Sequence, residues 1–362
     1  MPNPSPFDVI KPEVRGLSAY TLKHFDAAVK LDQNENPYEL PTDLKREVVD
    51  RVLRRPWGRY PEFVPAAVIH SLAKFTGWPS EGILVGNGSN ELIQASLTVT
   101  LGPGRKLAVP QPTFTLYKLM ATALQAEVAE ILLDAERLTF DVDKLLEASR
   151  TSEVVVVCAP NNPTGNLLER EALVALLKNA KGLVLVDEAY HEFSGQTAFS
   201  LLPDYRNLVV LRTFSKAMSM AGLRFGYMMA HPEIAREVYK SKLPYNVNIF
   251  TLTAAELVIE RRSLLNQAIA DLIRERDRVF AELHRRAAVR AFPSQANFIL
   301  MKTARPARQL FDALYGRGVL VRDVSSYPML DRCLRISIGT PEENDRFLAA
   351  LDQALENKNG ST

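Results

Sequence analysis

The sequence predicts an α/β protein with a large, doubly wound and mostly parallel sheet, accompanied by a smaller α+β domain. Two observations lead to this class. Short apolar runs alternate with helical patterns through the first part of the chain, and such alternation is typical of βαβ units. From about residue 260 the pattern changes to a long charged helix followed by segments of alternating polarity, which indicates a second unit.

The elements of the large domain can be justified in order. The run VVVVCAP, residues 154–160, begins with four valines, which favours a strand buried on both faces. The segment LLEREALVALLKNAKG keeps leucines at helical spacing and offers Gly182 as a cap for the helix end. Further strands are predicted at 82–88, 183–190 and 207–214, and a helix at 89–102.

The second unit rests on three segments. Residues 271–286 form a charged amphipathic helix, and NFILMKT (297–303) and CLRISIG (333–339) alternate in polarity as strands do. We expect residues 41–259 to form the large domain, and residues 1–40 together with 260–362 to form the small domain with an N-terminal arm.

Composition argues against several classes of function. The chain has 362 residues and a formal net charge of +2, so we expect no nucleic-acid partner. Without a run of about 18 apolar residues or a secretory pattern, we expect no membrane association. The two cysteines, Cys158 and Cys333, lie far apart, which is typical of a reduced, cytoplasmic protein. The five histidines are scattered, so we expect no metal site.

Polar groups follow the predicted strands at the edge where ligands bind in open α/β sheets. We expect four such groups to face one crevice: Gly88-Ser89-Asn90, Asn161 to Gly165, Asp187 with Tyr190, and Ser215-Lys216 with Arg224.

The first of these groups suits a phosphate monoester. Ser89 would cap the helix that begins there, and free N–H groups at a helix start favour an anion. Arg224 adds a fixed charge and Ser215 a hydroxyl donor. A dinucleotide site fits less well, because Glu91 stands where the third glycine of that motif belongs, and GPGRK (102–106) fails the spacing of a P-loop.

Asp187 and Lys216 suggest which phosphate compound binds. Asp187 ends an apolar strand, where a carboxylate needs a positive partner. That partner is either a helix end or a buried cation, or else the protonated ring nitrogen of a cofactor. A lysine near a phosphate site and an acid can form a Schiff base with pyridoxal 5'-phosphate and later act as the general base. Asn162 and Tyr190 would then hydrogen-bond the phenolic oxygen of the cofactor.

These residues, together with a series of ordered motifs, resemble the fold-type I pyridoxal-phosphate aminotransferases of class II. Their finer pattern is similar to histidinol-phosphate aminotransferases. The motifs span nearly the whole chain: VRGLSAY (14–20), KLDQNENPYELP (30–41), RYPEF (59–63), GNGSNELI (86–93), PTFTLY (112–117), PNNPTG (160–165), DEAYHEF (187–193), TFSKAMSMAGLRFGY (213–227), PYNVN (244–248), VLVRDVSSY (319–327) and CLRISIGT (333–340). The resemblance implies a homodimer with active sites shared at its interface.

The resemblance also implies a role for each matching residue. Lys216, Asp187 and Tyr190 would be catalytic. Cofactor contacts would come from Ser89, Asn90, Phe114, Asn162, Asp187, Tyr190, Ser215, Lys216 and Arg224, with Tyr60 reaching the phosphate from the neighbouring subunit. Substrate contacts would come from Tyr20, Asn36, Asn246, Arg322 and Arg335. Two departures are visible: GLSAY (16–20) lacks the proline that relatives commonly have before the tyrosine, and Glu39 stands where relatives usually have glycine.

The expected reaction is transamination between L-histidinol phosphate and 2-oxoglutarate, which gives imidazole acetol phosphate and glutamate. One pocket must then accept a phosphate from one substrate and carboxylates from the other, and arginine binds both. Arg322 and Arg335 are the candidates, although each would also suit an ordinary salt bridge. The alternatives are an aromatic-amino-acid aminotransferase, a threonine-phosphate decarboxylase, a cofactor-binding regulator and an NAD-dependent oxidoreductase.

Overall fold

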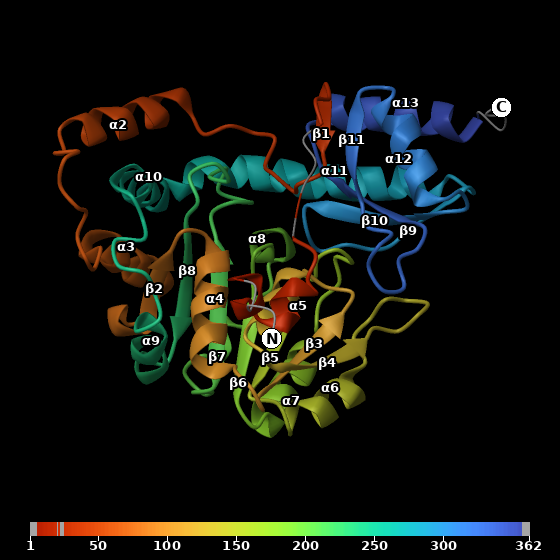
Figure 1. Cartoon of the computed structure of the whole chain (residues 1–362). Coiled ribbons are helices and arrows are strands. Elements are labelled where there is room, and N and C mark those ends of the chain that lie inside the picture. Colours follow the sequence, from red (N-terminus) through yellow and green to blue (C-terminus); the bar gives the residue numbers. More distant parts are fainter. Residues whose placement is uncertain (1–5, 20, 22–24, 357–362) are drawn as a thin grey trace.

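A computed structural model describes residues 6–19, 21 and 25–356. Its larger sheet has seven strands in the order β2-β8-β7-β6-β5-β3-β4 (Figure 1). Strand β8 runs antiparallel to both of its neighbours, whereas the other adjacent pairs are parallel. The fold class predicted from the sequence is confirmed. The strands are β2 (Ile83–Gly86), β3 (Lys106–Gln111), β4 (Glu127–Leu132), β5 (Val154–Cys158), β6 (Leu183–Asp187), β7 (Leu208–Thr213) and β8 (Gly226–Ala230).

Helices cover both faces of this sheet, as the valine run of β5 requires. Val154 and Val156 pack in one apolar cluster, and Val155 and Val157 pack in another on the opposite face. The first cluster includes α4 (Ser89–Thr100), α5 (Leu116–Ala123) and α9 (Pro232–Tyr239). The second includes α2 (Thr42–Leu53), α3 (Ala66–Thr76), α6 (Val142–Ser149), α7 (Arg170–Asn179) and α10 (Ile249–Glu260).

The smaller sheet has five strands in the order β1-β11-β12-β10-β9. Strand β1 comes from the N-terminal part of the chain and pairs in parallel with β11. Three helices pack their apolar sides on this sheet in a separate core (Figure 1). The elements are β1 (Val29–Leu31), α11 (Asn266–His284), β9 (Val289–Ala291), β10 (Phe298–Thr303), α12 (Ala307–Tyr315), β11 (Val319–Asp323), β12 (Cys333–Ser337) and α13 (Pro341–Glu356). The domain boundaries at 41–259 and 260–362 stay a prediction.

The predicted elements are present, most of them with shorter bounds, whereas the helix predicted at 271–286 runs from Asn266 to His284. The cap predicted for helix α7 is wrong. Helix α7 ends at an extended Ala180 and not at Gly182. Gly182 instead lies against the segment that leads into β5, where a Cβ atom would come within 2.0 Å of the carbonyl oxygen of Glu153. Close approach of two backbones, and not helix capping, therefore requires the glycine.

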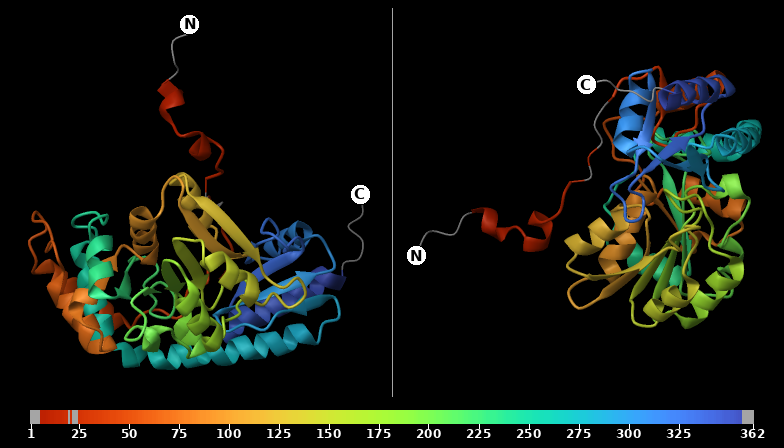
Figure 2. Two further views of the ribbon diagram at one scale, coloured as in Figure 1. Left: turned by 90° about the horizontal axis from the view of Figure 1, so that it is seen from below. Right: turned by 90° about the vertical axis from the view of Figure 1, so that its right-hand side faces the viewer.

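The first described residues form η1 (Pro6–Val9) and α1 (Pro12–Arg15), an arm at the side of the large domain (Figure 2). The arm contacts the end of α5, where Lys11 Nζ donates to the Ala123 carbonyl oxygen at 3.2 Å. The remaining short elements are η2 (Ser80–Gly82), α8 (His191–Ser194), η3 (Phe199–Leu201) and η4 (Arg262–Leu265). Within the described ranges, no helix has both the length and the apolar character needed to cross a membrane.

Candidate active site

A cavity of about 340 Å³ lies at the carboxyl ends of the large-sheet strands and extends to the small sheet. Eleven of the residues predicted from the sequence line it: Ser89, Asn90, Phe114, Asn162, Asp187, Tyr190, Ser215, Lys216, Arg224, Arg322 and Arg335. They come from loops after β2, β3, β5, β6 and β7 and from strands β11 and β12. The rule that ligands bind at the carboxyl ends of parallel strands explains why residues so far apart in sequence meet here.

One end of the cavity is built to hold an anion. Gly88, with φ of 78°, precedes helix α4, and no side chain caps its first amide groups. Ser89 is therefore the first helical residue and not the cap that we predicted. Arg224 donates from Nη1 to the Ser215 hydroxyl at 3.0 Å. A Cβ atom on Gly88 would lie 2.6 Å from Arg224 Nη2, so the glycine lets the guanidinium approach the start of the helix.

Asp187 lines the cavity and is 4% exposed. Its Oδ2 accepts a 2.6 Å hydrogen bond from the Tyr117 hydroxyl, and its Oδ1 accepts one from the backbone N–H of Ala189 at 3.2 Å. Burial raises the pKa of this carboxyl to about 6, although the Tyr117 hydrogen bond opposes the shift. Among the described residues, no cationic side chain forms an ion pair with it. A buried carboxylate of this kind favours a cationic ligand.

Lys216 faces Asp187 across the same cavity. Its Nζ donates to the carbonyl oxygen of Gln33 at 2.8 Å. Burial, and to a smaller extent the charge of Arg335, lowers the pKa of the amine to about 8. A larger fraction of the amine is therefore uncharged near neutral pH than for an ordinary lysine, and a nucleophile or a general base must be uncharged.

Tyr190 and Asn162 are both held by small-domain residues. The Tyr190 hydroxyl accepts a hydrogen bond from Asn34 Nδ2 at 3.1 Å, and burial raises its pKa. Asn162 Oδ1 accepts one from Arg335 Nη1 at 2.6 Å. The two sheets are thus tied together by hydrogen bonds that run through the cavity wall.

The two arginines of the small sheet differ in their surroundings. They occupy opposite positions on β11 and β12, where Arg322 pairs with Arg335. Arg335 is buried, stacks over Phe298 at 5.4 Å, and donates from Nη2 to the Asp32 carbonyl oxygen at 2.5 Å. Arg322 is half-buried, and within the described part of the chain it has no hydrogen-bond or ion-pair partner. Arg322 is therefore available to bind an anion inside the cavity.

Four predicted residues are not among those that line this cavity. Asn36 donates from Nδ2 to the Ala217 carbonyl oxygen at 3.1 Å and borders a neighbouring hollow. Asn246 donates from Nδ2 to Glu91 Oε2 at 2.8 Å. Tyr60 is 81% exposed and stacks on Tyr245 at 4.5 Å. Tyr20 lies outside the described residues. Their proposed roles stay predictions.

The structure also adds residues to the site. Sequence reasoning assigned no function to Asp32, Gln33, Asn34, Tyr117, Cys158, Ala189, Thr213 and Tyr327, all of which line the cavity. The sequence contains a signal that could have pointed to Tyr117, because it follows Phe114 by three residues. In the structure the two rings pack edge-on with their centroids 5.6 Å apart. A fully buried tyrosine usually has a partner for its hydroxyl, and here that partner is Asp187.

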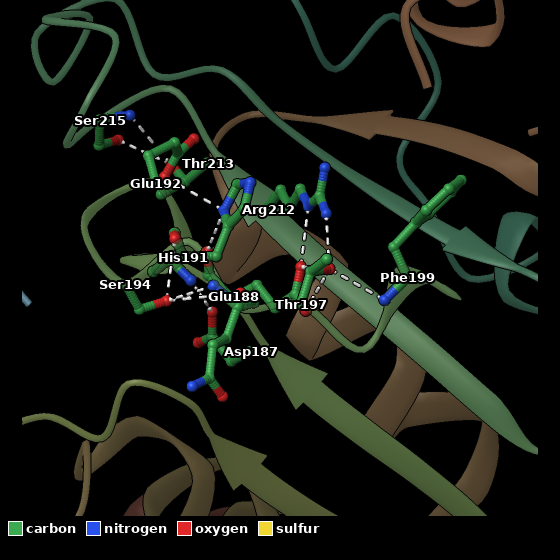
Figure 3. A network of polar contacts seen from close by, with 12 residues as sticks. Asp187, Glu188, His191, Glu192, Ser194, Thr197, Phe199, Arg212, Thr213 and Ser215 are labelled. Atoms are coloured by element: carbon green, nitrogen blue, oxygen red, sulfur yellow. Dashed lines mark hydrogen bonds and ion pairs between the residues drawn. The ribbon is translucent and has the colours of Figure 1, made fainter. Parts of the chain in front are cut away.

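A buried polar network lies next to Asp187 (Figure 3). Glu188, which is 1% exposed, accepts hydrogen bonds from Arg212 Nε at 2.9 Å and from the Thr197 hydroxyl at 2.8 Å. Arg212 Nη2 donates to the same hydroxyl at 2.9 Å (Figure 3). Because Glu188 follows β6 and Arg212 belongs to β7, the network joins the two strands whose loops carry Asp187 and Lys216.

The residues of the cavity fit pyridoxal 5'-phosphate. The uncapped start of α4 and the Arg224 guanidinium form a cradle for the phosphate, which the missing Cβ of Gly88 keeps open. The buried Asp187 carboxylate suits a protonated ring nitrogen, and the Lys216 amine of lowered pKa suits the aldehyde. No group of three or more potential metal ligands occurs among the described residues.

Comparisons with known proteins agree with this geometry. The family profile described as aminotransferase class I and II matches residues 26–351. A histidinol-phosphate aminotransferase of Chlorobium phaeovibrioides is 40% identical over 94% of this chain and 96% of its own length. The crystal structure of the histidinol-phosphate aminotransferase from Clostridium acetobutylicum superposes with a TM-score of 0.85 at 26% identity, covering 91% of this chain and 99% of that one.

A further solved structure shares the fold. The histidinol-phosphate aminotransferase from Sinorhizobium meliloti, in complex with pyridoxal-5'-phosphate, superposes with a TM-score of 0.84 at 20% identity, covering 96% of this chain and 97% of that one. The profile covers most of the chain, and the Chlorobium relative matches it almost from end to end. The chain therefore belongs to the family of class I and II aminotransferases.

Proposed function

We propose that this chain is a histidinol-phosphate aminotransferase that transfers the amino group of L-histidinol phosphate to 2-oxoglutarate, giving imidazole acetol phosphate and glutamate. Its cofactor is pyridoxal 5'-phosphate. The observation that carries the proposal is a single cavity in which an anion cradle, a buried carboxylate and a lysine of lowered pKa lie opposite a second cationic group, Arg322. The relative that is 40% identical is named for this activity.

The bound cofactor supplies an electrophilic carbon and a ring that accepts electrons from the substrate carbon. Lys216 would hold the cofactor through its Nζ, and its free amine would act as the general base that takes the proton from the substrate carbon bearing the amino group. Asp187 would keep the ring nitrogen protonated, and Tyr117 holds Oδ2 of that carboxylate in place. Ser89, Asn90, Ser215 and Arg224 would hold the phosphate, Phe114 would stack on the ring, and Asn162 and Tyr190 would donate to the phenolic oxygen.

The substrate anion binds chiefly to Arg322. Arg335 already donates to Asn162 and to the Asp32 backbone, whereas the Arg322 guanidinium projects into the cavity without a described partner. The phosphate of histidinol phosphate and the distal carboxylate of glutamate would take the same guanidinium in turn. Tyr20, Asn36 and Asn246 are the further substrate contacts proposed from the resemblance.

The proposed assembly is a homodimer with shared active sites. Tyr60 is exposed in the single chain and lies with Phe63 and Tyr245 in a group of solvent-facing aromatic residues. Such a group suits a subunit interface, from which Tyr60 would reach the cofactor phosphate of the partner. The proposed compartment is the cytoplasm, where the unpaired, buried Cys158 and Cys333 would stay reduced.

Initial rates test the substrate assignment. With 2-oxoglutarate as acceptor, histidinol phosphate should give a kcat/KM at least about tenfold above that of phenylalanine, because phenylalanine lacks the phosphate that Arg322 binds. A preference for phenylalanine would move the assignment to an aromatic-amino-acid aminotransferase. Release of carbon dioxide from threonine phosphate, without transamination, would move it to a decarboxylase.

A further inference from the structure

Asp32 is a buried carboxylate inside the cavity that the mechanism does not use. It is 5% exposed and lines the cavity together with Arg322 and Arg335. Its Oδ1 is buried and has no hydrogen-bond partner among the described residues. The nearest cation, Lys30, lies 4.0 Å from that oxygen and pairs more closely with Glu35. A buried polar atom without a hydrogen bond destabilises the fold, so one that persists inside a binding cavity points to a ligand.

The sheet register explains how Asp32 comes to lie there. Strand β1 pairs in parallel with β11, and Leu31 lies opposite Val321. The recorded pairing ends there, and its continuation by one residue brings Asp32 towards Arg322, which pairs with Arg335 on β12. Asp32 and Arg322 both line the cavity. Residues at opposite positions of neighbouring strands point to the same face of a sheet. Asp32, just beyond the end of β1, thus extends the pair of Arg322 on β11 and Arg335 on β12 by one acidic residue.

The charges in the cavity limit what Asp32 can bind. Of the described lining residues, two carry carboxylates, and Asp187 is the one that faces the cofactor nitrogen. The donor proposed above has three polar parts: an amine, which reacts at Lys216, a phosphate, which takes a guanidinium, and an imidazole. An imidazole ring carries at least one N–H donor at any pH near neutrality, and two when protonated. Phenylalanine and glutamate offer no such group on their side chains.

We propose that Asp32 is a specificity-determining residue that accepts a hydrogen bond from the imidazole ring of the amino donor. The proposal rests on the proposed function, because it takes histidinol phosphate as the donor. Arg322 and Asp32 line the same cavity, so one substrate can reach both with its phosphate and its ring. Burial raises the pKa of Asp32, whereas the charge of Lys30 opposes this shift, and an imidazolium would hold the carboxylate ionised.

The test compares two donors that differ only in the ring. These are histidinol phosphate and phenylalaninol phosphate, in which phenyl replaces imidazole. For Asp32→Asn, kcat/KM should fall on the order of tenfold or more with histidinol phosphate, mainly through KM, and should change less than about twofold with phenylalaninol phosphate. The matched control is Asp323→Asn, on β11 next to Arg322 but outside the cavity lining, where the carboxylate bonds to Ser325. For Asp323→Asn, kcat/KM should stay unchanged with both donors.

An equal loss with both donors would overturn the proposal and leave the proposed function standing. Failure of the wild-type enzyme to use histidinol phosphate would remove the proposed function, and the role of Asp32 with it. Wild-type enzyme also provides a test that does not depend on folding of the variant. Methylation of one or the other ring nitrogen of histidinol phosphate should lower kcat/KM at least about tenfold for one isomer. Equal kcat/KM values for histidinol phosphate and both methylated forms would exclude a hydrogen bond from a ring N–H to Asp32.

Discussion

Replacing Asp187 by asparagine should raise the stability of the cofactor-free protein and lower the activity of the cofactor-bound enzyme. The carboxyl is buried, and its pKa is raised from 3.8 to about 6. A shift of roughly two units at 1.36 kcal/mol each amounts to about 3 kcal/mol. Because the folded-state pKa lies above the unfolded value, the protonated carboxyl stabilises the fold below about pH 4, and this contribution is lost as the pH rises through about 6. The cofactor-free enzyme therefore carries a destabilising charge at pH 8.

Without cofactor, Asp187→Asn should accordingly be more stable than wild type by about 2–3 kcal/mol at pH 8, and the difference should vanish towards pH 4. With cofactor, activity should fall more than about 100-fold, because an amide cannot keep the ring nitrogen protonated. Urea unfolding of the cofactor-free proteins at several pH values measures the stability, with the exposed Asp204→Asn as control. A stability difference that is absent or independent of pH would refute the reasoning.

Three further predictions concern the proposed cofactor site. Tyr117→Phe removes the donor to Asp187 Oδ2 and should raise the pKa of that carboxyl further. The affinity for pyridoxal 5'-phosphate should then fall at neutral pH and recover at higher pH. Replacement of another buried tyrosine, Tyr227→Phe, should leave the pH profile of this affinity unchanged. Equal pH profiles for wild type and both variants would contradict the role of Tyr117. Lys216→Ala should abolish turnover, and borohydride should attach the cofactor covalently to wild type alone; near-normal activity of the variant would exclude Lys216 as the catalytic lysine. Mixed subunits of Tyr60→Ala and Lys216→Ala should regain a substantial fraction of activity, since one site of each heterodimer is intact, and a verified heterodimer without rescue would exclude Tyr60 from the partner's site.

The catalytic centre was predictable from sequence because it depends on local rules. Parallel strands bring their carboxyl ends to one edge, so the residues that follow β2, β5, β6 and β7 had to meet. Ser89 shows the limit of this reasoning. The helix begins at Ser89, as predicted, but the residue in the cap position is Gly88, whose φ is 78°. A pattern of residue types does not reveal a dihedral angle.

The substrate side was harder to predict because it depends on pairing between distant strands. Asp32 reaches the cavity only because β1, from the N-terminal part of the chain, lies beside β11. Periodicity within a segment indicates a strand, but it does not indicate which strand lies next to it. For the same reason, the hydrogen bond that ties Asn246 to Glu91 was not visible in the sequence.

The Glu188–Arg212 pair restricts which amino-acid substitutions this chain can accept in evolution. Its two charges are almost fully buried and share Thr197 as a hydrogen-bond partner. Loss of either residue alone would leave an uncompensated charge in the interior, at a cost of about 3–5 kcal/mol, whereas replacement of both by apolar residues of similar volume is often nearly neutral. Among descendants of this sequence, the two positions should therefore change together or not at all. The residue next to Asp187 is in this way held constant by a partner on another strand, independently of any contact with substrate.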